Sequence, residues 1–172
     1  MTLDIFIKKF INGDASAFDE IYNRTRTSVY YAALSVLRDK TLAEDVMQTT
    51  YIRVLKNIRS YMLGTNASAW IIKIARNEAL NVKKSRTREQ PVDENENNTI
   101  FGISNPDTYG ELTDLAKRLL TDDEFLILML VTACGYKRKE IGKILGMPIP
   151  TVTWKYRNAL FKMRNALEKE GY

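Results

Sequence analysis

The chain has 172 residues, with 26 lysines and arginines against 21 aspartates and glutamates, no histidine and one cysteine, and its net charge is +5. Without histidine the usual protease triads and histidine-dependent zinc or haem sites are excluded, so we expect no catalytic residue, no metal and no cofactor. The single Cys134 excludes a disulfide framework and fits a cytoplasmic location; no apolar run approaches the roughly 18 residues of a membrane span.

Charge is distributed unevenly along the chain. Residues 1–88 carry a net +7, residues 89–111 carry −6 and residues 112–172 carry +4. The acidic stretch also contains prolines, glycines and a run of asparagines, and it cannot bury enough apolar surface to offset the entropy lost on ordering. We therefore expect a flexible acidic linker at 86–109, between a helical domain at 1–85 and a second domain at 110–172.

The first block is predicted to be a small helical bundle. Its opening residues, MTLDIFIKKF, place lysines inside an amphipathic repeat, which does not resemble a signal peptide. Apolar residues recur at intervals of three and four, the period of a helix, over 3–10, 18–36, 43–58 and 71–82. Asn12-Gly13 ends the first stripe, and Asp14 is placed to cap the second helix.

The second block is also predicted to be helical, so the fold class is all-α with two small domains. Leucines at 112, 115 and 119 precede Thr121-Asp-Asp-Glu124, which has the pattern of a capping box. The apolar helix after it should stop at Gly135. A helix over 137–146, a short turn and a long helix starting near Pro150 follow.

Gly142, Gly146 and Val152 have the spacing of a helix-turn-helix. A small residue at 142 permits close approach, Gly146 can adopt a left-handed turn, and Val152 can fill the wedge between the helices. In a helix-turn-helix, the start of the second helix reaches base edges in the major groove. The alternative is a helical hairpin with a solvated basic face. The sides that can face outward carry Thr151, Thr153, Trp154, Lys155, Arg157 and Asn158.

Three stretches then resemble one family: LAEDVMQTTYIR at 42–53, AWIIKIARN at 69–77, and EIGKILGMP at 140–148 followed by Thr151-Val152. They resemble regions 2.2, 2.4 and 4.2 of bacterial RNA polymerase sigma factors of the sigma-70 family. The closest type is the small extracytoplasmic-function (ECF) factor, which has only regions 2 and 4. The resemblance implies a subunit without enzyme activity that recognises minus-10 and minus-35 promoter elements and promotes DNA melting.

The partners implied by the resemblance are core RNA polymerase (its clamp helices and flap), promoter DNA and an anti-sigma factor, with no direct membrane insertion. The helix expected at 43–58 would bind the clamp helices, although a merely solvated face is the alternative. Thr49 stands where the family usually has glutamate. The face opposite the buried stripe consists of Asp45, Gln48, Thr49, Ile52 and Lys56.

The resemblance assigns the minus-10 element to the loop 60–68 and the helix after it. A base flipped out of the DNA stack would be captured by the loop. Tyr61 and Asn66 are the candidates there, with a turn residue or a core edge as the alternative, and Trp70 is expected in the core. On the helix, Asn81 and Lys84 replace a more usual aspartate and arginine. The outward sector contains Lys73, Arg76, Asn77, Asn81 and Lys84.

The minus-35 element is assigned to the second helix of the helix-turn-helix. Trp154 would either cover thymine methyls or pack sideways against the protein. Leu160 and Phe161 stand where relatives tend to carry basic residues, and we expect them to contact the rest of region 4 or a protein partner. Lys137 stands where the family usually has a serine that caps the helix. It lacks that cap, but its positive charge can contact a phosphate. The full set is Lys137, Thr151, Thr153, Trp154, Lys155, Arg157 and Asn158.

Two alternatives stay open at this level. The acidic linker, with Asp93, Glu94 and Glu96, could imitate nucleic acid inside the polymerase or act only as a solubilising tether. A stand-alone helix-turn-helix regulator would account for the second block. It would leave the polar face of residues 44–56 and the basic fourth helix unexplained.

Overall fold

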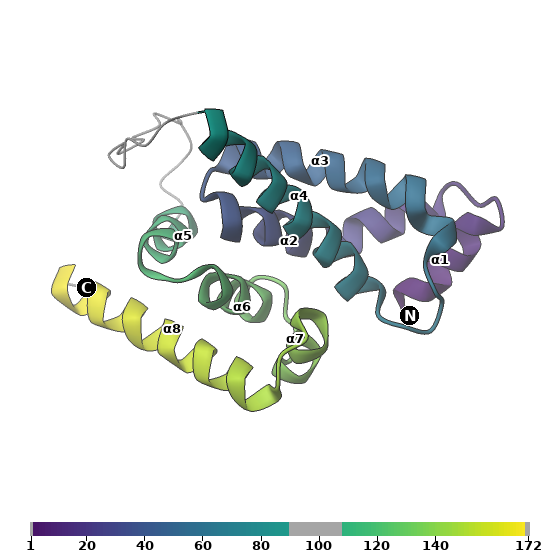
Figure 1. Ribbon diagram of the computed structural model, residues 1–172. Helices are drawn as coiled ribbons and strands as arrows, with labels where there is room; N and C mark the ends of the chain where they lie inside the picture. The colour runs from purple at the N-terminus through teal and green to yellow at the C-terminus, as the bar shows by residue number, and fades with distance from the viewer. Residues whose placement is uncertain (1, 90–107, 171–172) are drawn as a thin grey trace.

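The computed structural model describes residues 2–89 and 108–170, and over these residues the protein is all-α, as the sequence predicts (Figure 1). A 3₁₀ turn, Ile58–Ser60, follows the third helix, and no strand forms within the two described ranges. The helices are α1 (Leu3–Ile11), α2 (Ala17–Leu37), α3 (Lys40–Asn57), α4 (Ala67–Glu89), α5 (Thr108–Leu119), α6 (Asp122–Thr132), α7 (Arg138–Leu145) and α8 (Ile149–Glu170).

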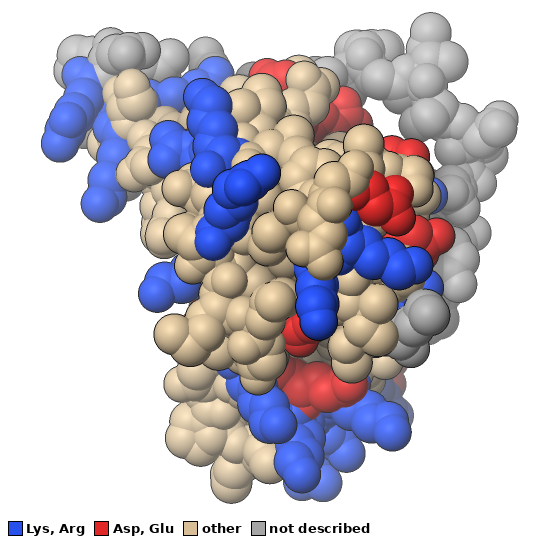
Figure 2. All heavy atoms as spheres, turned by 90° about the vertical axis from the view of Figure 1, so that its right-hand side faces the viewer, with Lys and Arg blue, Asp and Glu red and all other residues tan. Residues whose placement is uncertain are grey.

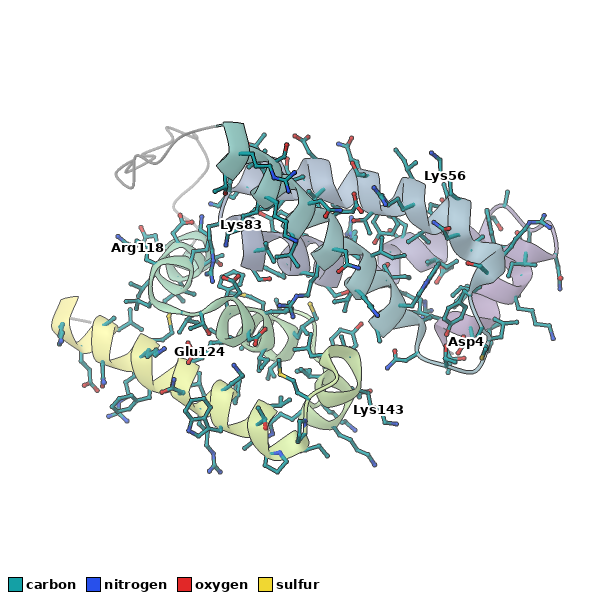
Figure 3. All side chains as sticks on the ribbon, viewed as in Figure 1. Asp4, Lys56, Lys83, Arg118, Glu124 and Lys143 are labelled. Carbon is teal, nitrogen blue, oxygen red and sulfur yellow. The ribbon has the colours of Figure 1, made fainter. Side chains whose placement is uncertain are left out.

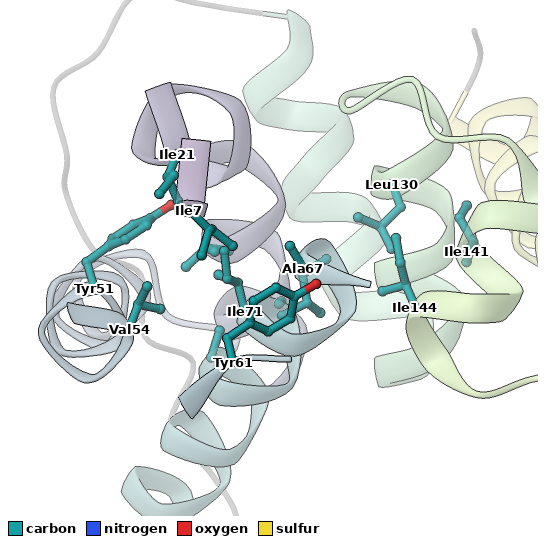
Figure 4. Packing of buried hydrophobic residues seen from close by; sticks show 14 of the residues in the cluster. Ile7, Ile21, Tyr51, Val54, Tyr61, Ala67, Ile71, Leu130, Ile141 and Ile144 are labelled. Carbon is teal, nitrogen blue, oxygen red and sulfur yellow. The ribbon is translucent and has the colours of Figure 1, made fainter. Parts of the chain in front are cut away.

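Helices α1 to α4 form one bundle, in which α2 contacts each of the other three. The predicted apolar stripes face its interior, where Ile7, Ile21, Val54 and Ile71 are completely buried (Figure 4). The hydroxyl of Tyr51 also lies inside and is 2.8 Å from Thr25 Oγ1, so this polar group keeps a hydrogen-bond partner. Burial of the stripes therefore fixes which side of each helix remains exposed.

The predicted cap of α2 is wrong in one detail. Asp14 accepts a hydrogen bond from the hydroxyl of Ser16 at 2.6 Å instead of capping the helix with its side chain. The N–H groups of Ala17 and Phe18 bond to the carbonyls of Asp14 and Ala15, so a short turn separates Asp14 from the start of α2.

The second block contains the predicted helix-turn-helix. The capping box is confirmed, because the N–H of Thr121 donates to Glu124 Oε2 at 3.0 Å and the Thr121 hydroxyl accepts from the Glu124 N–H. Gly146 ends α7 with a left-handed φ of +66°. Val152 is completely buried between α7 and α8. These contacts fix α8 against α7 and leave one side of the first turns of α8 exposed.

The two blocks pack directly against each other, which the sequence prediction of two domains on a flexible linker did not include. Helix α6 lies against α2, and α7 lies against α4. In Figure 4, Leu130, Ile141 and Ile144 of the second block face the cluster around Ala67 and Ile71. The signal for this packing in the sequence is the uninterrupted apolar run from Phe125 to Leu130 in α6. The structure buries every residue at 124–130. A helix that is apolar on all sides needs cover on all sides, and α8 and α2 supply it from opposite blocks.

The predicted linker boundaries also need correction. Helix α4 continues to Glu89, past the expected end of the first domain at 85, and α5 begins at Thr108. Arg86 and Arg88 lie in the last turn of α4, where positive charge is favourable beside the helix C-terminus. Asp93, Glu94 and Glu96 lie outside the described residues.

Gly142 provides a test of the helix-turn-helix packing. A Cβ at this position would lie 2.8 Å from the carbonyl oxygen of Met147, a backbone atom of the turn. We expect Gly142→Ala to lower the free energy of unfolding by about 1–3 kcal/mol, measured by urea denaturation.

Gly110→Ala is the matched control. Gly110 is also helical, but among the described residues no atom outside its chain neighbours and its own helix backbone lies within 4 Å of an added Cβ. This variant should gain up to about 1 kcal/mol, because alanine loses less backbone entropy than glycine. Equal effects of the two substitutions would show that the turn does not constrain residue 142.

Candidate nucleic-acid interface

The predicted polymerase-binding face of α3 is open over its whole length. Asp45, Gln48, Thr49, Ile52 and Lys56 are all exposed, and Figure 3 shows Lys56 pointing away from the bundle. The isoleucine is 53% exposed, and Leu55 of the same helix is 41% exposed. The hydroxyl of Thr49 donates to the Asp45 carbonyl oxygen within the helix.

The exposed side of α4 forms a groove with α3. The open hollow between them has a volume of about 400 Å³ and combines apolar walls with amide and cationic groups. Its lining residues are Arg53, Asn57, Ile74, Asn77, Glu78, Leu80, Asn81 and Lys84. Three of the predicted minus-10 residues therefore share one surface, and Lys73 is exposed on the same helix.

Arg53 and Asn57 are groove residues that sequence reasoning missed. Arg53 Nε lies 2.9 Å from Oε1 of the buried Glu78, so an ion pair joins the two walls. The amide nitrogen of Asn57 donates to the Arg53 carbonyl oxygen, which leaves its side-chain oxygen as an acceptor. Only the antiparallel register of α3 and α4 brings these residues beside Asn77 and Asn81, and that register is not visible in the sequence pattern.

Arg76 does not lie with the other predicted minus-10 residues. Its guanidinium is half-buried, and Nη2 lies 3.1 Å from Oδ1 of Asp123 in α6. The prediction that it shares an outward sector with Lys73 and Lys84 is therefore not met in this arrangement, because the second block covers that part of α4.

The loop before α4 exposes side chains other than those predicted. Tyr61 is 7% exposed, its hydroxyl donates to Asp4 Oδ1 at 2.8 Å, and its ring lies 5.0 Å from that of Trp70. Burial, together with Asp4, raises the pKa of Tyr61. Asn66 accepts a hydrogen bond from the Ala69 N–H and begins α4. Tyr61 and Asn66 thus take the alternative roles of core edge and turn.

Two apolar side chains occupy the exposed part of this loop. Met62 is 73% exposed and Leu63 is 43% exposed. Sequence reasoning passed over them because it searched for a stacking ring and an amide. A run of two apolar residues beside a turn was the available signal.

The exposed side of α8 presents Trp154 and Arg157, with Thr151 and Thr153 half-buried beside them. Trp154 is 63% exposed, so it does not pack sideways against the protein. Phe161 is 62% exposed and Leu160 is 43% exposed, so this pair does not pack into the rest of the second block either. Along the exposed side of α8, Trp154 and Arg157 are therefore followed by the apolar pair Leu160 and Phe161.

Lys155 and Asn158 point inward, contrary to the prediction. Lys155 Nζ lies 3.3 Å from Asp123 Oδ2, and the amide of Asn158 donates to Glu124 Oε1. Both side chains join α8 to the first turn of α6. Helical spacing alone allowed either direction, and the carboxylates of α6 decide it.

Basic side chains gather around α7. Figure 2 shows lysines and arginines at the bottom of that view, over this helix and its neighbours. Lys137 precedes α7 and is exposed, and its N–H donates to Glu140 Oε2 at 2.7 Å. The side chain of Lys137 is therefore open to solvent, and its contact with a phosphate stays a prediction.

Comparison with known proteins relates the chain to a protein family. Residues 21–89 match the family model described as Sigma-70 region 2. The ECF RNA polymerase sigma factor SigK of Mycobacterium tuberculosis is 26% identical, over 96% of this chain and 94% of the relative. The ECF RNA polymerase sigma factor SigM of Bacillus subtilis is 25% identical, over 87% of this chain and 92% of the relative.

Residues 21–89 therefore have the sequence of a sigma-70 region 2, and the chain is similar to ECF sigma factors over nearly its whole length.

Solved structures show that the chain shares its fold with proteins of low sequence identity. CnrH, in complex with the cytosolic domain of CnrY, has a TM-score of 0.70 at 18% identity and covers 98% of both chains. The sigma factor RpoE from Bartonella quintana, in complex with the anti-sigma factor NepR, has a TM-score of 0.64 at 20% identity, over 88% of this chain and 96% of that one.

Three further findings concern the rest of the protein. Within residues 2–89 and 108–170, histidine, cysteine and carboxylate side chains form no cluster that could hold a metal, and no helix is long and apolar enough to cross a membrane. The thiol of Cys134 is half-buried, and this burial raises its pKa to about 11. The thiol therefore stays protonated, and unreactive as a nucleophile, at neutral pH.

Glu124 joins α6 to α8, the helix on which most of the predicted minus-35 residues lie. Its side chain is almost completely buried, between α6 and α8 (Figure 3). Burial by itself would raise its pKa, but hydrogen bonds from Lys162 Nζ (2.7 Å), the Thr121 N–H and the Asn158 amide outweigh it and lower the pKa to about 2. The carboxylate is therefore ionised wherever the protein is folded near neutral pH.

We expect this group to contribute to acid unfolding. Because the folded pKa lies below the ordinary value of 4.5, the ionised Glu124 stabilises the fold above that value, and the contribution is lost as the pH falls toward 2. Glu124→Gln should reduce the free energy of unfolding by about 1–3 kcal/mol at pH 7 and flatten its fall below pH 5, measured by urea denaturation across the pH range.

Glu168→Gln is the control for this measurement. Glu168 pairs with Arg164 on the exposed side of α8, so solvent screens the pair. Its removal should leave the pH dependence as in the wild type. An unchanged acid limb in Glu124→Gln would contradict the role assigned to the buried carboxylate.

Proposed function

We propose that this protein is an ECF RNA polymerase sigma factor that binds core RNA polymerase through the open face of α3, directs it to promoters with minus-10 and minus-35 elements, and promotes melting of the DNA. The observation that carries the proposal is the placement of three distinct surfaces on one chain. They are the mixed polar and apolar face of α3, the amide-rich groove of α3 and α4, and the exposed side of α7 and α8.

The α3 face has the composition of a protein contact. It combines exposed Ile52 with acceptors and a single cation, Lys56, whereas a nucleic-acid surface would be dominated by positive charge. Exposed aliphatic side chains among polar ones are typical of interfaces. We assign this face to the clamp helices of the polymerase.

The groove between α3 and α4 suits the minus-10 element. Asn77 and Asn81 offer both donors and acceptors to base edges, and Lys84 supplies positive charge for a phosphate. Arg53 and Asn57 extend the same surface. Met62 and Leu63 at the neighbouring loop present apolar area that can pack against an unstacked base during melting.

The exposed side of α8 suits the minus-35 element. Arg157 can make bidentate hydrogen bonds to guanine in the major groove, and Trp154 can cover thymine methyls. The lysines and arginines around α7 supply phosphate contacts that set the orientation of the helix. Lys155 and Asn158 are left out of this assignment, because they already bond to α6.

An anti-sigma partner completes the proposal. RpoE and CnrH, the structural relatives, were each solved in complex with another protein, and NepR is named as an anti-sigma factor. The exposed Leu160 and Phe161 provide apolar area for such a partner on this chain. A stand-alone DNA-binding regulator would have no use for the α3 face.

Reconstituted transcription tests the function as a whole. Core polymerase from the source organism is incubated with fragmented genomic DNA, with and without the protein, and the 5′ ends of the transcripts are sequenced. We expect added start sites that share two sequence elements, near −10 and −35. If no start site depends on the protein, while the protein alone binds DNA tightly, the regulator alternative is favoured.

Substitution of Ile52 tests the polymerase face. Ile52→Asp should weaken binding to core polymerase by tenfold or more, about 1.4 kcal/mol, because an aspartate would be desolvated in the interface. Binding is measured by fluorescence anisotropy of the labelled protein. Ile5→Asp on α1, also an exposed isoleucine, is the control and should bind as the wild type does. Equal loss in both variants would remove the α3 face from consideration.

Arg157→Ala tests base recognition by α8. If Arg157 reads a base, affinity should fall by about 1–3 kcal/mol, and discrimination should be relaxed at one minus-35 position only. The measurement is holoenzyme binding to a set of promoters with every single-base change. A uniform loss over all sequences would mark Arg157 as a phosphate contact. Arg164→Ala, on the same helix but ion-paired to Glu168, is the control.

A further inference from the structure

The groove between α3 and α4 contains a carboxylate to which the proposed promoter contacts give no role. Glu78 of α4 lines this groove but is only 7% exposed, and a buried carboxylate is costly unless a charged partner compensates it. That partner belongs to the opposite wall, because Nε of Arg53 in α3 lies 2.9 Å from Glu78 Oε1. The two helices lie side by side (Figure 1), so the ion pair joins the two walls of the groove.

The two members of this ion pair differ in exposure. The side chain of Glu78 is 9% accessible, whereas that of Arg53 is 52% accessible. Within the part of the chain that the structure describes, no other carboxylate pairs with this guanidinium, and its terminal nitrogens, Nη1 and Nη2, make no hydrogen bond. The carboxylate therefore holds the inner nitrogen and leaves the outer edge of the guanidinium available to a ligand in the groove.

Glu78 also restricts where that outer edge can lie. Rotation of Arg53 away from Glu78 would leave a buried carboxylate without its partner, which is more costly than separating two exposed charges. An arginine held in this way has already lost much of the side-chain freedom that binding would otherwise remove. The ion pair thus sets the positions of two hydrogen-bond donors before any ligand arrives.

The charge of the pair favours a base over a phosphate as the ligand. A phosphate bound to Arg53 would also lie near the Glu78 carboxylate, and the two negative charges would repel each other. The major-groove edge of guanine is uncharged and offers two acceptors, O6 and N7, to the two nitrogens of an arginine. Lys84 lines the same groove without a carboxylate partner among the described residues, so it suits a phosphate better than Arg53 does.

We propose that Arg53 recognises a guanine of the minus-10 element through Nη1 and Nη2, and that Glu78 is the positioning residue that holds Arg53 for this contact. The inference rests on the proposed function, because it needs the groove to bind promoter DNA. Guanine exposes O6 and N7 both in the major groove of the duplex and on an unstacked base, so the contact can form before or after melting.

Arg53→Lys tests the contact with the base. Lysine keeps the positive charge, but an ammonium that pairs with Glu78 has no second nitrogen to offer a guanine. The measurement is holoenzyme binding to promoters that carry every single-base change in the minus-10 element. We expect the wild type to prefer guanine at one position by about tenfold or more, and Arg53→Lys to lose this preference at that position only.

Two results of this measurement overturn the inference. One is an unchanged set of base preferences in Arg53→Lys, or a wild type that prefers guanine at no minus-10 position. The other is an equal loss of affinity for every sequence, which would identify Arg53 as a phosphate contact.

Glu78→Gln tests the positioning role. The amide has nearly the same shape as the carboxylate but holds the guanidinium less strongly, and it leaves no unpaired charge in the interior. The preference for guanine should fall by at least about threefold at the position that Arg53 recognises and at no other. A merely structural role would instead lower the stability to urea, or the affinity for all sequences alike, and would contradict the proposal.

The double variant with Arg53→Lys and Glu78→Gln shows whether the two residues act together. If Glu78 acts only through Arg53, the double variant should have the same base preferences as Arg53→Lys alone. Losses that add would show that Glu78 influences recognition by another route, and the positioning role would be wrong.

Arg24 and Glu20 provide a matched control pair. Nε of Arg24 lies 2.9 Å from Glu20 Oε2, the same separation as in the groove, but this pair lies within α2 and outside the groove lining. Arg24→Lys and Glu20→Gln should therefore keep every base preference of the wild type. A loss of guanine preference in these variants as well would overturn the assignment to the groove.

Failure of the inference differs from failure of the proposed function. If the holoenzyme initiates at promoters with a minus-10 element, and Arg53→Lys reads each position as the wild type does, only the inference is overturned. If no start site depends on the protein, the proposed function is wrong, and the inference that rests on it is overturned too.

Discussion

A carboxylate can remain charged away from water only when hydrogen bonds replace its hydration, and the buried Glu124 meets this condition with partners from two elements. The Thr121 N–H begins α6, and Asn158 and Lys162 belong to α8. The bond set therefore fixes how α8 crosses α6, and with it which residues of α8 face outward. Trp154 and Arg157 are exposed because their neighbours Lys155 and Asn158 are held inward.

The same turn of α6 connects this local order to the arrangement of the whole molecule. Asp122 and Asp123 reach across to α2 and α4, while the apolar residues after them are covered by α2 on one side and α8 on the other. Polar and apolar contacts therefore agree on one placement of the two blocks. The second block covers the part of α4 that carries Arg76, whereas the predicted polymerase-binding face of α3 stays exposed.

The sequence was sufficient for the helices, the capping box at Thr121 and the left-handed Gly146, because each depends on residues close together in the chain. It was also sufficient for the family, through three short stretches. It could not supply the groove residues Arg53 and Asn57, since these depend on the register of α3 against α4. The inward direction of Asn158 depends on its contact with Glu124 across the fold, and no local pattern reports it.

Helix α3 is exposed on one side toward the proposed polymerase contact and lines the groove on another, with Ile52 and Arg53 adjacent in sequence. Under the proposed function, α3 therefore takes part both in binding the polymerase and in recognising the promoter. Under the proposed function, substitutions at Arg53 or Asn57 that change the promoter preference must also preserve the shape of a helix that binds the polymerase. Positions on α4 and α8 belong to the proposed promoter surfaces alone. We therefore expect substitutions that change promoter preference among related factors to accumulate there first.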